Sequence, residues 1–176
     1  MVSADGNPNM LARAFRNARN RDLLLRTAQA DWRFLNRDIH GTFDAVICLG
    51  NSFTHLFKER DRRKSLAEYY AVLKHNGLLI MDHRNYDRLL EGGGAVRNGK
   101  GNVYCGEDVE VAPEHVDEGL ARFRYAFSDS STYHLNMFPL RYGYVRRLMS
   151  EVGFQKITSF GDYQRDFENP DFYIHV

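Results

Sequence analysis

The chain has 176 residues, of which 43% are apolar and 13% aromatic, enough to bury one hydrophobic core. Lysine and arginine (24) nearly balance aspartate and glutamate (23), and the formal charge of +1 argues against a nucleic-acid or anionic-membrane partner. No apolar run approaches the roughly 20 residues of a transmembrane helix and no charged-then-apolar leader is present, so we expect a single cytoplasmic domain.

The first thirty residues predict a strand, a helix and a second strand. Residues 2–5 are typical of the end of a strand. Asn7 followed by Pro8 predicts a helix over 8–19, because proline presets φ where a missing N–H costs nothing. Residues 23–30 then predict another strand. Apolar side chains recur along the helix at spacings of three and four, which predicts one buried stripe. They are Met10, Leu11, Ala14, Phe15 and Ala18.

The segment from residue 43 to 55 carries the strongest signal for a site. Residues 46–49 form an unbroken apolar run, typical of a parallel α/β strand covered on both faces by helices. The polar loop that follows, from Gly50 to His55, would lie beyond the carboxyl end of this strand. Ligands bind at that place in open sheets of this kind. The loop is therefore a candidate site by position.

The remaining elements complete a doubly wound pattern and then depart from it. Residues 91–101 hold five glycines and predict a mobile loop. Aromatic-rich segments predict an antiparallel meander inserted beside the main sheet at about 102–138. The other predicted elements are a helix over 59–74 that ends at Asn76 and Gly77, a strand over 78–82, meander strands over 104–111, 120–127 and 132–138, a helix over 141–152, and an antiparallel pair over 154–160 and 172–176.

Three residues near the amino-terminal strands are candidates for nucleoside binding. Asp5 ends a strand just ahead of a capped helix, where an acid accepts hydrogen bonds from both hydroxyls of a ribose. Its other interpretation is a solvated turn aspartate. The pair Asp31 and Trp32 could recognise adenine, with the carboxylate accepting from the amine and the indole covering the ring. A core tryptophan beside a surface acid explains the pair equally well. Leu49 and Gly50 would add a close backbone approach.

Arg84 follows a buried strand and is a candidate for binding a carboxylate. Its planar guanidinium matches the two oxygens of an amino acid's acid group. The alternative is a surface ion pair of Arg84 with Asp82 or Asp87. The neighbouring His83 is expected to pack in the core.

Neither the histidines nor the cysteines predict a metal centre. The histidines show no i, i+4 pairing with carboxylates, the spacing that many metal sites use. Cys48 and Cys105 lie far apart without paired spacing, so we expect free thiols and neither a disulfide framework nor a zinc site.

Three segments resemble the glycine N-methyltransferases: FDAVICLGNSF (43–53), DHRNYD (82–87) and the closing FYIHV (172–176). The run from CLGNSFTHL through FKERDRRKSLAE to LNMFPLR is most similar to the bacterial glycine/sarcosine N-methyltransferases of betaine synthesis. The resemblance covers essentially the whole chain. It implies the Rossmann-like α/β fold of class I methyltransferases, with S-adenosylmethionine as methyl donor, glycine or sarcosine as acceptor, and a possible homo-oligomer.

The resemblance also implies roles for individual residues. On the donor side the matches are Asp5 for the ribose, Met10 near the adenine, Asp31 and Trp32 as adenine clamp, and Leu49 with His55 under the donor. On the acceptor side they are Asn51 for the amine, Arg84 for the carboxylate, and Tyr125 near the reacting centre, with Tyr104 a further match in a less certain register.

The sequence departs from the family in two places. Family members carry a strand and a DxxxGTG-like loop before the segment that begins here with Met1, and no such loop is present. That strand belongs between the strands that end at Asp5 and Leu49. We therefore expect an N-terminal truncation, with a gap in the sheet and two rows of unpaired backbone groups. The second departure lies near Met137 and Phe138, which replace a tyrosine of the animal enzymes' acceptor pocket.

Two functions of different classes remain open at this point. The first is transfer of a methyl group to glycine or sarcosine by direct displacement. The second is a catalytically inert fragment that acts only as a nucleoside-binding or assembly module, pairing through its exposed sheet edges. A nucleic-acid methyltransferase is disfavoured by the near-neutral charge and by the acceptor match at Arg84.

Overall fold

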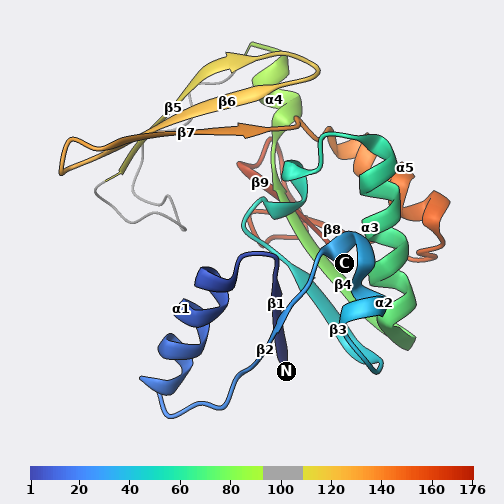
Figure 1. The fold of residues 1–176 in the computed structure, drawn as a ribbon. Coiled ribbons are helices and arrows are strands. Elements are labelled where there is room, and N and C mark those ends of the chain that lie inside the picture. The colour runs from blue at the N-terminus through green and yellow to red at the C-terminus, as the bar shows by residue number, and fades with distance from the viewer. Residues whose placement is uncertain (93–108) are drawn as a thin grey trace.

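The computed structural model describes residues 1–92 and 109–176, which form three sheets flanked by helices (Figure 1). In hydrogen-bonded order the sheets are β1-β2, β3-β4-β9-β8 and β5-β6-β7. None of the helices in the described residues is long and apolar enough to cross a membrane. The strands are β1 (Val2–Asp5), β2 (Arg26–Gln29), β3 (Phe43–Cys48), β4 (Leu73–Arg84), β5 (Val109–Val116), β6 (Ala121–Phe127), β7 (Thr132–Met137), β8 (Ser159–Gly161) and β9 (Phe172–His175). The helices are α1 (Pro8–Arg19), α2 (Leu35–Asp38), α3 (Glu59–Val72), α4 (Tyr86–Leu90) and α5 (Tyr142–Val152), with short 3₁₀ turns η1 (Trp32–Phe34) and η2 (Ser52–His55).

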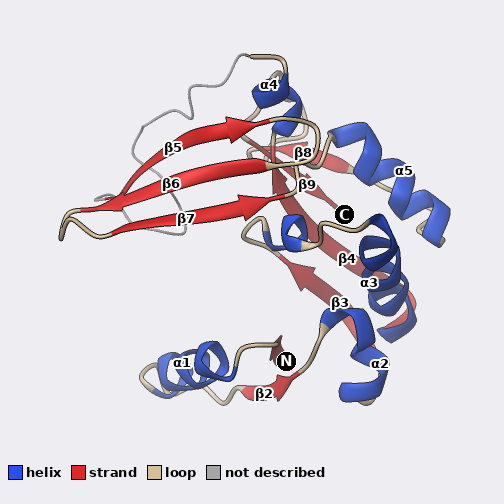
Figure 2. Ribbon diagram, turned by 45° about the horizontal axis from the view of Figure 1, so that its top comes forward, coloured by secondary structure: helices blue, strands red, loops and turns tan. Residues whose placement is uncertain are grey.

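The predicted α/β class is confirmed by parallel pairing in two of the sheets. β1 lies parallel to β2 and β3 parallel to β4, while β9 runs antiparallel between β4 and β8. The third sheet, β5 to β7, is the predicted antiparallel meander and lies near the end of β4 that leads into α4 (Figures 1 and 2). The expected antiparallel pair at the end of the sequence is also confirmed, in β8 and β9, although β8 begins only at Ser159 and not at residue 154.

The expected gap in the sheet is confirmed. β1 pairs with β2 alone and β3 with β4 alone among the described residues, so each of the two strands has one edge without a strand partner. Residues of β1 and β3 line one common cavity. The backbone polar groups along these edges lack the ladder partners that neighbouring strands normally supply.

The hydrophobic core lies between the four-stranded sheet and the helices α3 and α5. Arg62 of α3 is buried within it, and its charge is satisfied by the carbonyls of Leu56 (2.6 Å) and Phe57 (2.8 Å) and by stacking over the ring of Phe138 at 3.8 Å. The buried members of the core include Phe53, Leu66, Tyr69, Val72, Leu79, Met81, Val145, Leu148 and Met149.

Two predicted burial patterns are wrong, both beside the gap. On α1 only Leu11 is buried, whereas Met10 and Phe15 are 50% and 46% exposed. The two-stranded sheet under this helix is too narrow to cover the whole stripe. On β3 the burial alternates: Cys48 is buried against Tyr69, whose hydroxyl lies 3.7 Å from the sulfur, but Ile47 is 62% exposed. The strand is therefore covered on one face and not on both.

Several element boundaries also differ from the prediction. α3 ends at Val72, two residues early, because the chain continues directly into the long strand β4. β2 begins at Arg26 and leaves Leu24 94% exposed before it. By contrast α1 begins at Pro8 after an Asn7 cap, as predicted.

The end of α5 is confirmed at Gly153, whose φ of 125° favours glycine. The first meander strand spans 109–116 and not 104–111. Tyr104, Cys105 and most of the predicted glycine loop lie outside the described residues.

Candidate active site

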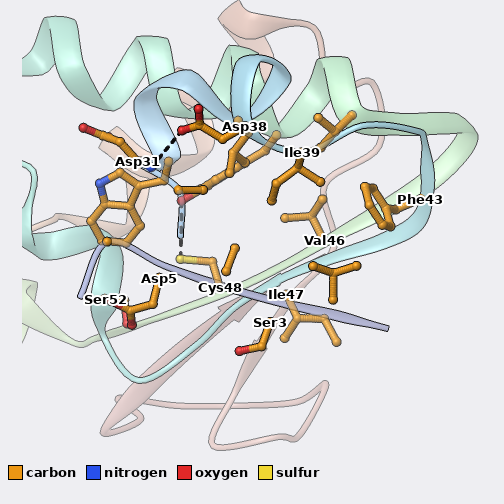
Figure 3. A pocket seen from close by; sticks show the side chains of 18 of the residues that line it. Ser3, Asp5, Asp31, Asp38, Ile39, Phe43, Val46, Ile47, Cys48 and Ser52 are labelled. Atoms are coloured by element: carbon orange, nitrogen blue, oxygen red, sulfur yellow. Dashed lines mark hydrogen bonds between the residues drawn. The ribbon is translucent and has the colours of Figure 1, made fainter. Parts of the chain in front are cut away.

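A cavity of about 1310 Å³ lies between β1 and β3 (Figure 3). Ser3 and Asp5 come from one wall and Val46, Ile47 and Cys48 from the other. Five of the six residues expected to hold the donor line this cavity: Asp5, Asp31, Trp32, Leu49 and His55. Met10 is not among its lining residues, because it lies on the exposed face of α1. The residues expected to bind the nucleoside, Met10 excepted, therefore line one cavity.

Asp5 lies at the rim of the cavity with part of its carboxylate in use. Its Oδ1 accepts the backbone N–H of Asn7 at 2.7 Å, which fixes the turn ahead of α1. The residue is exposed. The turn interpretation and the ligand interpretation are therefore compatible, since the hydrogen bond to the turn orients a carboxylate that still faces the cavity.

Asp31 is an ionised, rigidly held carboxylate at the start of η1. Its oxygens accept from Arg33 Nη2 at 2.6 Å and Nε at 3.0 Å, and from the backbone N–H of Arg33 at 2.9 Å. This contact with the guanidinium lowers the pKa of Asp31. Its own N–H points to Asp38 at 3.4 Å (Figure 3). An amine that binds Asp31 has to share the carboxylate with Arg33, and the half-buried Trp32 beside it supplies an aromatic surface.

The loop after β3 turns sharply through two left-handed residues. Gly50 has a φ of 79° and Asn51 a φ of 60°, a conformation that asparagine tolerates better than most side chains. The N–H of Asn51 donates to Asp82 Oδ1 at 2.7 Å, and the Ser52 hydroxyl donates to the Leu49 carbonyl at 2.7 Å. This turn leaves Leu49, Ser52 and His55 on the cavity but buries Asn51 away from it.

Asn51 is the centre of a second polar group behind the cavity. Its Nδ2 donates to the Tyr86 hydroxyl at 2.8 Å and lies 2.9 Å from Met137 Sδ, and its Oδ1 accepts the backbone N–H of Arg84 at 3.1 Å. Burial raises the pKa of Tyr86 to about 12, and Tyr125 acts in the same direction, so Tyr86 stays neutral. Tyr125 itself is half-buried on β6, opposite Tyr133.

Arg84 is half-buried with its guanidinium stacked on two rings. Its Cζ lies 4.9 Å from the centroid of Phe172 and 5.4 Å from that of Phe123. An ion pair with Asp87 does not form in the part of the chain that the structure describes, because Asp87 binds Arg141 Nη1 at 3.2 Å and the N–H of Tyr142 at 2.8 Å. The two rings lie at cation–π distance from the guanidinium and restrict where it can move.

Asp31, Trp32 and Arg84 were expected in one pocket, and Arg84 does not line the cavity that the other two share. The cavity lining includes the first two but neither Arg84, Asn51 nor Tyr125. The left-handed turn at Asn51 buries that side chain behind the loop, and the Arg84 guanidinium at the end of β4 lies against Phe123 and Phe172. The donor and acceptor groups are instead two neighbouring clusters joined by the loop over residues 49–55.

Two residues of the acceptor cluster were not given a role by the sequence. Tyr86 and Met137 both contact the Asn51 amide. Tyr86 stands two positions after Arg84 in the quoted DHRNYD segment, which could have indicated it. The departure noted near Met137 had already placed that residue at the acceptor pocket, although without a contact to Asn51. No group of three or more His, Cys, Asp or Glu side chains that could hold a metal ion occurs within residues 1–92 and 109–176.

Comparison with solved structures defines the class of protein. An S-adenosylmethionine-dependent methyltransferase from Clostridium acetobutylicum matches with a TM-score of 0.78 at 18% identity, over 99% of this chain and 72% of that one. The PH0226 protein from Pyrococcus horikoshii matches with a TM-score of 0.65 at 20% identity, over 99% and 69%. A family model described as a methyltransferase domain matches residues 1–77. The fold is that of the S-adenosylmethionine-dependent methyltransferases.

Sequence relatives narrow the class to one family. The chain is 90% identical over all 176 residues to a glycine/sarcosine N-methyltransferase of Parasynechococcus marenigrum, and 61% identical to one of Halorhodospira halochloris. A human glycine N-methyltransferase is 42% identical over 89 residues, which are 46% of this chain and 30% of that protein. The chain belongs to the glycine/sarcosine N-methyltransferase family. It spans 62% of the length of the Parasynechococcus relative and 66% of that of the Halorhodospira relative.

Proposed function

We propose that this chain carries the adenosine-binding and acceptor-binding parts of an N-methyltransferase that moves a methyl group from S-adenosylmethionine to glycine or sarcosine, in betaine synthesis. The observation that carries the proposal is the loop over residues 49–55. One side of it lines the cavity with Leu49 and His55, and the other side presents Asn51 to the backbone of Arg84. The names of the relatives point to the same reaction.

The cavity chemistry fits the nucleoside part of the donor. Asp31 is kept ionised by Arg33 and can accept from an adenine amine, Trp32 offers a ring for stacking, and Asp5 can accept from ribose hydroxyls. S-adenosylmethionine, when bound, supplies an electrophilic methyl group on a sulfonium. The chain's own residues hold its adenosine end and set its direction along the loop.

The acceptor cluster fits a small zwitterion. Arg84 can bind the carboxylate through a bidentate pair. The Asn51 Oδ1 already accepts the Arg84 N–H, but a carbonyl oxygen has two lone pairs, so it can also accept from an amine. Tyr125 completes the proposed catalytic set beside the neutral hydroxyl of Tyr86.

The mechanism needs positioning more than acid–base chemistry. A neutral amine attacks the methyl carbon in line, the carbon–nitrogen bond forms as the sulfur–carbon bond breaks, and the sulfur leaves with the electron pair. The amine loses its proton to water before binding, so no strong base is required. Arg84 and Asn51 fix the amine, and tyrosine oxygens near Tyr125 stabilise the partial charge on the methyl group.

Calorimetry with S-adenosylhomocysteine tests the donor site. Trp32→Ala is expected to weaken binding roughly 10- to 100-fold, because stacking of a base on an aromatic ring contributes about 1–3 kcal/mol. Phe34→Ala is the matched control, an aromatic of the same 3₁₀ turn that does not line the cavity and contacts Lys64 instead. Equal affinity of the parent protein and Trp32→Ala would contradict the adenine assignment.

A second function, an assembly module, is favoured by the open edges of β1 and β3. A strand that runs parallel to both could pair with each of them at once, whether it comes from a longer polypeptide or from another subunit. The same edges could contribute to a homo-oligomer. In this proposal the donor cavity is completed only after the strand is added.

Strand addition has a direct test. We would add, as a separate polypeptide, the part of the Parasynechococcus relative that lies outside the match. We expect it to raise the melting temperature of this chain by about 5 °C or more, since each kcal/mol of added stability shifts Tm by roughly 2–4 °C in a domain of this size. The control is the same polypeptide with prolines at alternate positions of its strand, which cannot donate to a ladder. If neither polypeptide changes the melting temperature of the chain, the assembly proposal is contradicted.

A further inference from the structure

A line of four side chains connects α5 to the backbone of Arg84. Arg146 Nη1 donates to Ser159 Oγ at 2.6 Å, and Ser159 Oγ lies 2.9 Å from His175 Nδ1. His175 Nε2 lies 3.0 Å from His83 Nε2, and His83 Nδ1 lies 2.9 Å from the carbonyl oxygen of Arg84. Both imidazoles are fully buried.

The hydrogen bonds of this line can run in only one direction while both imidazoles are neutral. A carbonyl oxygen only accepts, so His83 Nδ1 carries the proton and His83 Nε2 is an acceptor. His175 Nε2 must then donate to it, which leaves His175 Nδ1 to accept from the Ser159 hydroxyl. Ser159 in turn accepts from Arg146. Each group therefore donates toward Arg84, and both tautomers are set by their neighbours.

Burial keeps the two imidazoles neutral. It lowers the pKa of His83 to about 4 and that of His175 to about 3, and the charge of Arg146 acts in the same direction on His175. The ring of Tyr142 covers the pair at 5.6 Å from His175, and Tyr173 packs at 5.6 Å from His83. Asp82 and Asp87 are the acids near enough to His83 to oppose its desolvation.

Side chains hold both backbone polar groups of Arg84. Its N–H donates to Asn51 Oδ1 at 3.1 Å, and its carbonyl accepts from His83. The residue is the last of β4, where strand pairing with β9 ends at Phe172. The pairing with β9 continues through the N–H of Asn85, which donates to the Asp171 carbonyl at 2.9 Å, so both polar groups of Arg84 are left to the side chains of Asn51 and His83.

We propose that the His83–His175–Ser159–Arg146 line is a positioning device that fixes the backbone of Arg84 and thereby aims its guanidinium at the acceptor carboxylate. The inference rests on the proposed function of Arg84 as carboxylate anchor. The charge of Arg146 polarises the line, so the final N–H of His83 is a stronger donor than an isolated imidazole would be. These four residues do not touch the acceptor, and they act through Arg84.

The first test reads the geometry of Arg84 without substrate. In nitrogen-detected NMR at neutral pH we expect His83 as the Nδ1–H tautomer and His175 as the Nε2–H tautomer. Ser159→Ala is expected to shift the Arg84 Nε–H signal and the Asn85 amide, which shares the peptide group of the Arg84 carbonyl. Ser65→Ala is the matched control, since Ser65 is also buried but its hydroxyl has no hydrogen-bond partner among the described residues. Opposite tautomers, or unchanged Arg84 signals in Ser159→Ala, would overturn the proposal.

The second test measures glycine binding in the presence of saturating S-adenosylhomocysteine. Ser159→Ala is expected to weaken glycine roughly 10-fold, His175→Phe more than that, and His175→Gln less than His175→Phe because the amide restores a donor. Affinity for S-adenosylhomocysteine should change by less than about 2-fold in all three. Where turnover is measured, all three variants should raise the KM for glycine and leave kcat unchanged.

The outcomes separate this inference from the proposed function. Glycine that fails to bind even the parent protein counts against the acceptor assignment, and the NMR experiment still decides whether the line positions Arg84. Glycine affinity that falls in Arg84→Lys but not in Ser159→Ala or His175→Phe overturns the positioning role and leaves the anchor role intact. A purely structural role predicts a lower Tm in Ser159→Ala with unchanged Arg84 signals.

Discussion

Arg84→Ala is expected to raise the KM or Kd for glycine by roughly 30-fold or more, because truncating one partner of a desolvated charged pair costs about 2–5 kcal/mol and each 1.4 kcal/mol is tenfold. The physical reason is the match between a planar guanidinium, held between Phe123 and Phe172, and a carboxylate. Affinity for S-adenosylhomocysteine should change little, since Arg84 does not line the cavity.

Two further variants sharpen this measurement. Arg84→Lys keeps the positive charge but removes the planar, bidentate donor group, so we expect a loss of glycine affinity intermediate between the parent protein and Arg84→Ala. Arg122→Ala is the control, because Arg122 is an exposed arginine of β6 that pairs with Glu114 at 3.4 Å. An equal loss of glycine and S-adenosylhomocysteine affinity in Arg84→Ala would defeat the assignment, because it would mean that the substitution disturbed the fold and not a specific contact.

Local signals in the sequence predicted the elements whose cause is itself local. Asn7 and Pro8 fix the start of α1, and Gly153 fixes the end of α5, since capping depends on residues within one turn. The quoted family segments predicted the fold class and the gap between β1 and β3. Burial beside the gap was mispredicted, because the exposure of Ile47 and Phe15 depends on which elements stand next to them and not on their own pattern.

The site shows the same division between local and distant causes. Asp31, Trp32 and Leu49 were predicted together and do line one cavity, because the carboxyl ends of neighbouring parallel strands meet at one edge. Arg84 was expected in the same pocket and lies outside it. Its guanidinium lies against Phe123 of β6 and Phe172 of β9, and contacts with residues so distant along the chain cannot be predicted from the residues next to Arg84.

The buried pair His83 and His175 also predicts a loss of stability in mild acid. In the unfolded chain a histidine titrates near its ordinary pKa of about 6.5. In the folded protein the pKa values are lowered to about 4 and about 3 by burial. Between pH 6.5 and 4 the unfolded state therefore binds more protons than the folded state. The free energy of unfolding is thus largest above pH 6.5 and decreases as the pH falls through this window.

The expected slope distinguishes these histidines from the carboxylates. One proton of difference corresponds to about 1.4 kcal/mol per pH unit, so two histidines give up to about 2.7 kcal/mol per pH unit in the middle of the window. Ion-paired acids such as Asp31, whose pKa is lowered by Arg33, lose their contribution only as the pH falls below the ordinary aspartate range. Their window therefore lies at lower pH than that of the imidazoles.

Urea denaturation at intervals from pH 7.5 to 4 measures this slope. The double variant His83→Asn, His175→Gln is expected to be less stable at pH 7.5 but to lose less further stability than the parent protein down to pH 4.5, because neither amide takes up a proton. His55, whose pKa burial also lowers, keeps its own contribution to the slope in both proteins. His75→Gln, at an exposed histidine, should keep the slope of the parent protein. A parent protein whose free energy of unfolding is flat between pH 6.5 and 4.5 would show that the imidazoles are not held neutral in the fold. The directional line from Arg146 to Arg84 would then lose its basis, since an imidazolium donates from both nitrogens and cannot accept from its neighbour.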